Sequence, residues 1–163
     1  DRKTWLSLSE TTPFSFDVVL MSSRGPRKSF RVGAGRAHVS DIPQPSTPTA
    51  IHLIHSGSAA APADPDTVAG RWLERGAYAY VGSVREPRLS AFVPPKTMTA
   101  RLLSGAPFLL AARLYDLRPW RITTIGDPLM VLMRARDRLP PERLPLTSQS
   151  ARPVEAASVL AAE

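Results

Sequence analysis

Three short runs of apolar and β-branched residues constrain the fold more than any other feature of the sequence. They occupy residues 16–21 (FDVVLM), 49–55 (TAIHLIH) and 77–84 (AYAYVGSV). Apolar side chains follow one another in these runs instead of alternating with polar ones. That pattern is typical of strands buried on both faces, and hence of parallel sheets. A parallel sheet needs helices on each of its faces, so the runs predict an α/β protein.

Helix signals lie where such a fold needs them. Between the second and third runs, a helix is predicted with Asp66 as its N-cap and Gly76 at its end. A helix that directly joins two strands implies parallel pairing with a right-handed crossover. Further elements are expected as helical segments at 4–8, 96–103 and 108–115, a basic connection at 27–48, and strands at 120–125 and 129–133.

These elements predict a three-layer α/β domain, with a mostly parallel sheet flanked by helices, over residues 1–133. Residues 134–163 are charged and proline-rich, which predicts a tail in which VEAASVLAAE has the pattern of a short helix. The chain starts with Asp1 instead of Met, so we expect a processed product or a piece of a longer protein. The longest apolar run, 106–112, is too short to cross a bilayer, and no membrane span is expected.

Composition excludes some chemistry. The 163 residues include no cysteine, which excludes disulfides, thiolate metal sites and thiol nucleophiles. The net charge of +7 allows a nucleic-acid partner. However, the arginines are spread along most of the chain, and the basic stretch at 24–36 contains one aromatic residue, Phe30. A solvated basic loop is therefore favoured over a nucleic-acid surface.

Polar residues follow each of the three buried runs. In open parallel sheets, sites lie beyond the carboxyl ends of the strands. Those ends fall at residues 22–25, 55–58 and 83–86. We therefore expect any functional site to be assembled from these three segments.

Two longer segments resemble a known family. DTVAGRWLERGAYAYVGSVREP at 66–87, followed by TTIGDPLMVL at 123–132, is similar to the gingipain-like cysteine peptidases of the caspase fold and to the related CHAT domains. In those families one strand ends in His-Gly and the next ends in Ala-Cys, and a Gly-Asp-Pro turn comes near the end. The resemblance covers about residues 14–133, and this chain would supply the whole caspase-like domain or its C-terminal part.

The resemblance implies a peptidase in which a histidine assists a cysteine thiolate, but both residues are replaced here. VVLMSSRG matches the strand that ends in His-Gly, with Arg24 in the histidine position before Gly25. IHLIHSGS matches the strand that ends in Ala-Cys, with Ser56 in the cysteine position and His55 before it. Arginine stays protonated and cannot act as a base, so the chemistry of the family is not available.

Several residues remain as candidates. Ser56 needs a base, and His55, His52 or His38 could be one, although neighbours on a strand point to opposite faces. The alternative is that His52 and His55 are packed, hydrogen-bonded strand residues. For substrate binding, Gly25, Ser83, Arg85 and Glu86 match the family pocket. No metal site and no cofactor are expected, because the spacing of His52 and His55 suits a helix better than a strand.

The favoured function is that of a catalytically degenerate gingipain-like domain, which acts as a structural or peptide-binding module. A groove lined by Arg24, Ser56 and Arg85 would favour acidic peptides, because guanidiniums pair with carboxylates. The resemblance implies a bacterial protein of the envelope or one that is secreted. The alternatives are a hydrolase that uses Ser56 with a histidine, and a basic nucleic-acid-binding module.

Overall fold

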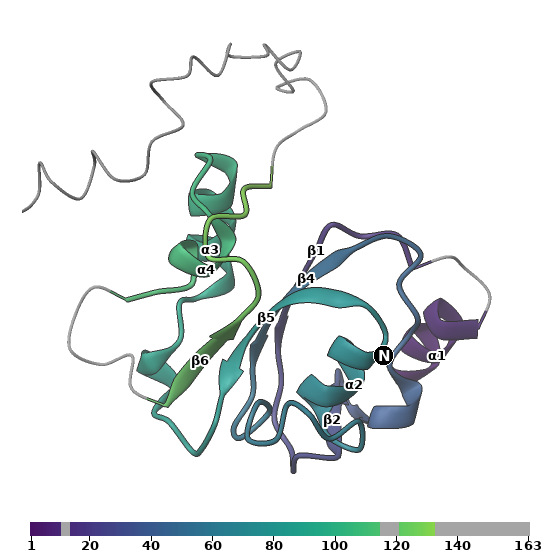
Figure 1. Ribbon diagram of the computed structural model, residues 1–163. Helices are drawn as coiled ribbons and strands as arrows, with labels where there is room; N and C mark the ends of the chain where they lie inside the picture. The colour runs from purple at the N-terminus through teal and green to yellow at the C-terminus, as the bar shows by residue number, and fades with distance from the viewer. Residues whose placement is uncertain (11–13, 115–120, 133–163) are drawn as a thin grey trace, which may run out of the picture. The chain divides into compact units, whose positions relative to one another are not determined.

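A computed structural model describes residues 1–10, 14–114 and 121–132, which all belong to one compact unit, Asp1–Leu132 (Figure 1). The predicted tail at 134–163 lies outside these residues. Helices and strands follow one another in the order α1 (Arg2–Glu10), β1 (Val18–Ser22), β2 (Ser29–Val32), β3 (Gly35–His38), η1 (Val39–Asp41), β4 (Thr49–Ile54), α2 (Val68–Glu74), β5 (Ala77–Ser83), η2 (Leu89–Ala91), α3 (Pro95–Leu103), α4 (Phe108–Ala111) and β6 (Ile122–Ile125).

The central sheet is mostly parallel, as the continuous apolar runs predict. Its strand order is β1-β4-β5-β6. Strands β1, β4 and β5 run parallel, and β6 pairs antiparallel with β5. In the register, Ser22 lies opposite Ile54 and His52 opposite Val81, so the three parallel strands end at the same edge of the sheet.

Helices cover both faces of the sheet, which confirms the three-layer arrangement (Figure 1). On one face, Trp72 of α2 and Trp5 of α1 pack in one core cluster with Ile51 and Leu53 of β4. The neighbouring residue Ala50 points the other way and belongs to a second cluster, formed with residues of α3 and α4. Both faces of β4 are therefore buried, because successive side chains alternate across the sheet.

A β-hairpin occupies part of the connection predicted as a long loop at 27–48. Strands β2 and β3 pair antiparallel, with Phe30 opposite Ala37 and Val32 opposite Gly35. Phe30 and Ala37 are completely buried, and their burial holds the hairpin against the core. Gly33 turns the chain with φ +60°, a conformation that favours glycine. The glycines of RVGAGR thus serve a hairpin turn.

Other local predictions need correction. The N-cap of α2 is Thr67, whose hydroxyl accepts from the amide of Gly70; it is not Asp66. Residues 129–132 form no strand. Instead, the Met130 carbonyl accepts from the Phe108 amide after a turn in which Asp127 accepts from the Leu129 amide. Asp127, in the Gly-Asp-Pro segment, is therefore a turn residue. The helix predicted at 108–115 ends at Ala111, and residues 115, 120 and 133 lie outside the described ranges.

Candidate functional site at the carboxyl edge of the sheet

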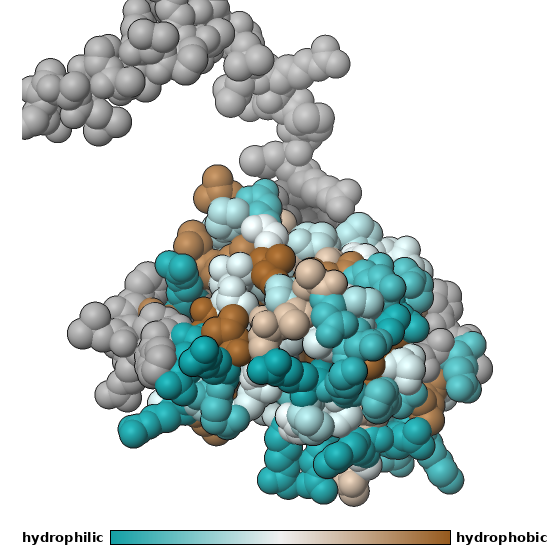
Figure 2. Space-filling model, turned by 60° about the horizontal axis from the view of Figure 1, so that its bottom comes forward, coloured by the Kyte–Doolittle hydropathy of each residue, from teal (hydrophilic) through white to brown (hydrophobic). Residues whose placement is uncertain are grey.

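Hydrogen bonds join the loops that follow β4 and β5 at the carboxyl edge. The buried Ser83 hydroxyl donates to the His55 carbonyl and accepts from the Gly57 amide, both at 2.8 Å. The Ser56 hydroxyl donates to Oε1 of Glu86, also at 2.8 Å. Four of the predicted site residues therefore lie together. Much of the side of the molecule brought forward in Figure 2, where these loops lie, is hydrophilic.

His55 is buried under the loop that follows β1. It is 1% exposed, with Nδ1 3.0 Å from the Ser56 carbonyl and Nε2 3.2 Å from the Ser29 carbonyl. A Cβ placed on Gly25 would lie only 2.7 Å from the Ser29 carbonyl oxygen, so glycine lets this loop pass close to the carbonyl that His55 contacts. Burial lowers the pKa of His55, while hydrogen bonds to the two carbonyls and the charge of Glu86 oppose the shift. Both ring nitrogens thus face backbone oxygens, and neither faces the Ser56 hydroxyl.

The other two histidines are no closer to serving as a base for Ser56. His52 is completely buried on β4, and neither of its ring nitrogens has a hydrogen-bond partner. Burial lowers its pKa to about 4. His38 is exposed at the end of β3, where its amide donates to Asp41. The prediction of packed, hydrogen-bonded histidines is confirmed for His55, whereas His52 is packed without a hydrogen bond.

The two amides that follow Ser56 do not provide the usual second part of an acyl-transfer site. That chemistry needs free N–H groups near the nucleophile to stabilise an oxyanion. The two amides that follow Ser56 already have acceptors: the Gly57 amide bonds Ser83, and the Ser58 amide lies 3.4 Å from the His55 carbonyl. Among the described residues, the Ser56 hydroxyl therefore bonds to the carboxylate of Glu86 and to no histidine ring.

Exposed arginines surround this edge. Arg24 and Arg85 follow β1 and β5, and no acidic side chain forms an ion pair with either within residues 1–10, 14–114 and 121–132. The Arg27 side chain lies over Gly57, with its Cγ and Nε 3.9 Å from the position of a Cβ there. The carboxylate of Glu86 accepts from the Ser56 hydroxyl and forms no ion pair with Arg85. The edge is therefore positively charged.

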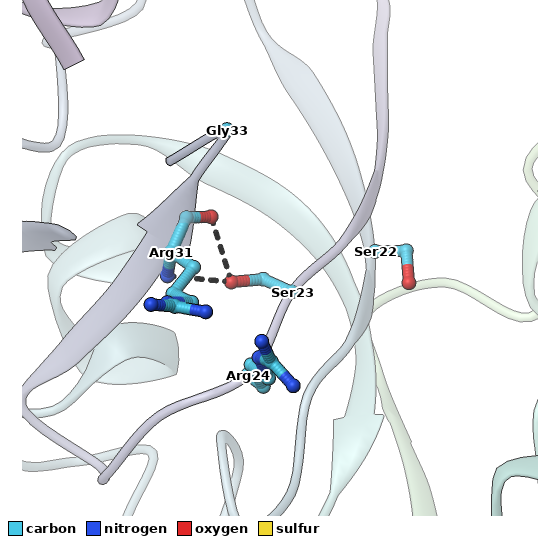
Figure 3. Close-up of a pocket in the computed structure, with 5 residues that line it drawn as sticks. All are labelled: Ser22, Ser23, Arg24, Arg31 and Gly33. Atoms are coloured by element: carbon cyan, nitrogen blue, oxygen red, sulfur yellow. Dashed lines mark hydrogen bonds between the residues drawn. The ribbon is translucent and has the colours of Figure 1, made fainter. Parts of the chain in front are cut away.

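An open hollow of about 350 Å³ lies beside the end of β1, and we call it the arginine hollow. Its lining residues are Ser22, Ser23, Arg24, Arg31 and Gly33 (Figure 3). The Ser23 hydroxyl donates to the Arg31 carbonyl at 2.9 Å and accepts from the Arg31 amide at 2.8 Å. The same amide also lies 3.1 Å from the Arg24 carbonyl. These bonds hold β2 against the end of β1 and place two guanidinium groups around one hollow.

Sequence reasoning missed Arg31 and Arg27 as site residues. Both come from the segment predicted as a loop, and only the hairpin brings Arg31 to Arg24. Among the described residues there is no group of three histidine, aspartate or glutamate side chains that could hold a metal ion. No helix in the same ranges is long and apolar enough to cross a membrane. Comparisons with models of protein families, with curated proteins and with solved structures found no match.

Proposed function

We propose that this chain is a catalytically degenerate relative of the gingipain-like peptidases of the caspase fold, and that it binds acidic peptides. The single observation that carries the loss of catalysis is the hydrogen bonding around Ser56. Its hydroxyl is bonded to Glu86, while both ring nitrogens of His55 face backbone carbonyls. A serine hydroxyl needs a base that is free to take its proton, and His55 is not placed to do so.

The architecture supports the family relationship. The segments matched to the family dyad end two neighbouring parallel strands, β1 and β4, and their loops meet at one edge. The stretch VGSVRE, from the segment that resembles the family, follows at the end of β5, with Ser83 inside the site. The Gly-Asp-Pro turn follows β6, which pairs with β5. The order of these parts is the order that the resemblance implies.

Charge supports an acidic ligand. Arg24, Arg31 and Arg85 are exposed, and they form no ion pair with an acidic side chain in the described part of the chain. A guanidinium holds a carboxylate with two parallel hydrogen bonds, which favours carboxylates over neutral amides. An exposed contact of this kind contributes on the order of 1 kcal/mol, or about fivefold in affinity.

The test compares a fluorescein-labelled peptide that contains glutamates with the same peptide carrying glutamines. We expect at least tenfold tighter binding of the acidic peptide in an anisotropy titration. Arg24→Ala should weaken it about fivefold, while Arg113→Ala, which removes another exposed arginine, should leave it within twofold. Equal affinity for both peptides would refute the proposal. Binding of a single-stranded oligonucleotide that falls steeply with salt would favour the nucleic-acid alternative.

The hydrogen bond between Ser56 and Glu86 favours one second candidate, a serine hydrolase with a carboxylate as its base. A fluorophosphonate probe tests it, because such probes label only activated serines. We expect no labelling of the chain. Labelling that disappears in both Ser56→Ala and Glu86→Gln would show that Ser56 is activated and that the degenerate interpretation is wrong.

A further inference from the structure

Strand β1 is an edge strand with one free side. It pairs with β4 and with no other strand of residues 1–10, 14–114 and 121–132. At its two ends, the Asp17 carbonyl and the Ser23 amide both bond to β4. Peptide groups of successive residues in a strand point to opposite edges. The N–H and C=O groups of Val18, Leu20 and Ser22 therefore point away from β4, toward the free side.

Strand β1 itself carries none of the features by which a strand's own residues prevent strand addition. Edges are usually protected by charged side chains, by proline or by a bulge. The sequence of β1 is VVLMS, and its register with β4 is continuous over all five residues. Val18, Val19, Leu20 and Met21 are half-buried, although their side chains pack against the two core clusters. An added strand would bury the apolar surface that remains on both faces.

The arginine hollow lies where this edge ends. Ser22 is both the last residue of β1 and part of the hollow lining, and Arg24 and Arg31 surround the same space (Figure 3). A strand added parallel to β1 would reach the hollow with its carboxyl-terminal end. The positive charge of the hollow favours a peptide that has a carboxylate at this carboxyl-terminal end.

We propose that an extended peptide of a partner protein adds to the free edge of β1, parallel to it, and places a carboxylate in the arginine hollow. The proposal deepens the proposed function and rests on it, because it assumes an acidic peptide as the ligand. Backbone hydrogen bonds to Val18, Leu20 and Ser22 supply the sequence-independent part of the affinity. Apolar residues on both faces of the peptide, followed by an acidic end, supply the selectivity.

The probe is a fluorescein-labelled peptide of sequence Thr-Val-Ile-Val-Glu-Glu, titrated against the full chain. Ser22→Pro removes the outward-facing amide and keeps the bonds to β4, because Pro is tolerated where an edge N–H faces solvent. Ser22→Ala is its matched control, since it removes the hydroxyl and keeps the amide. We expect the proline variant to bind the peptide at least tenfold more weakly than the alanine variant does, with circular dichroism showing that both variants are folded.

A second pair of peptides tests the backbone contact independently of any variant. Methylation of alternate backbone nitrogens removes strand hydrogen bonds from one edge of the peptide and keeps its charge. We expect binding to fall at least tenfold when the edge that faces β1 is methylated, and less when the opposite edge is. Two further peptides show which carboxylate binds in the hollow. A peptide with a C-terminal amide lacks the terminal carboxylate, and the glutamine peptide lacks the side-chain carboxylates. Loss of affinity in neither case would overturn the carboxylate contact.

Three outcomes would overturn the edge proposal in different ways. If the acidic peptide binds and Arg24→Ala weakens it, but Ser22→Pro and methylation have no effect, the peptide does not add to β1 and the proposed function survives. If no preference for the acidic peptide exists at all, the proposed function itself fails. A concentration-dependent dimer in analytical ultracentrifugation that Ser22→Pro abolishes would assign the edge to a second copy of the chain.

Discussion

Replacement of His52 by leucine should make the stability of the protein less sensitive to acid. The ring is 0% exposed, and its two nitrogens have no hydrogen-bond partner. Its neighbours in the register are Leu20 and Val81, both apolar. Burial lowers the pKa from 6.5 to about 4, because the protonated ring would lose its hydration without gaining a partner.

The sign and size of the effect follow from proton linkage. The unfolded chain takes up a proton at His52 near pH 6.5 and the folded chain only near pH 4. Between these values the unfolded state binds more protons, so the free energy of unfolding falls as the pH is lowered. The shift corresponds to about 3 kcal/mol in total, of which about 2 kcal/mol falls between pH 7 and pH 5.

Urea unfolding followed by tryptophan fluorescence at pH 7, 6 and 5 measures this loss. We expect His52→Leu to lose about 2 kcal/mol less than the parent protein between pH 7 and pH 5. Some acid sensitivity should remain, because burial also lowers the pKa of His55. At pH 7 the variant should be as stable as the parent or more so, since two unpartnered buried atoms are removed. An unchanged pH dependence in His52→Leu would refute the reasoning.

Three further substitutions should destabilise the fold in the same urea assay. Thr67→Ala removes the cap of α2 and should cost about 1–2 kcal/mol. Gly70→Ala should cost more than the usual range for a point mutation, above about 3 kcal/mol, because its Cβ would lie 1.9 Å from the Asp64 carbonyl oxygen. Ser83→Ala should cost about 2 kcal/mol, because it removes the acceptor of the Gly57 amide and the shorter of two hydrogen bonds to the His55 carbonyl.

Each substitution has a matched control. Asp66→Ala removes the residue that the sequence suggested as the cap, and its carboxylate is exposed in both of its ion pairs, so its cost should stay below about 1 kcal/mol. Gly76→Ala adds a Cβ with nothing within 4 Å, although φ is +97°, and should cost about 1 kcal/mol. Ser90→Ala changes an exposed serine and should be neutral. A larger loss in any control than in its partner variant would contradict the structural explanation.

The part of the fold that was predictable from the sequence is the part with a strong local signal. The runs at 16–21, 49–55 and 77–84 are apolar without alternation, and this alone indicates buried parallel strands. Because the carboxyl ends of such strands share an edge, the meeting of Ser56 with Ser83 and Glu86 was predictable as a neighbourhood. The individual hydrogen bonds were not, since they depend on side-chain geometry.

The hairpin shows why the rest was not predictable. Its strands have four residues each and contribute a single fully buried apolar side chain apiece, Phe30 and Ala37, too few for a recognisable alternation. Without the hairpin, Arg31 could not be placed beside Arg24. The cap of α2 was misplaced by one residue because Asp and Thr are both good N-caps, and only the bond to Gly70 decides between them.

The hairpin also bears on how the chain reaches its fold. Parallel strands β1 and β4 pair across a long connection, and closing such a loop normally slows folding. Strands β2 and β3 contact each other locally, so they can form before β1 meets β4. A hairpin that is already formed shortens the flexible part of the connection. The entropic cost of closing the loop then falls by a few tenths of a kcal/mol. Because Phe30 is completely buried, we expect the hairpin to dock on the core before β1 pairs with β4.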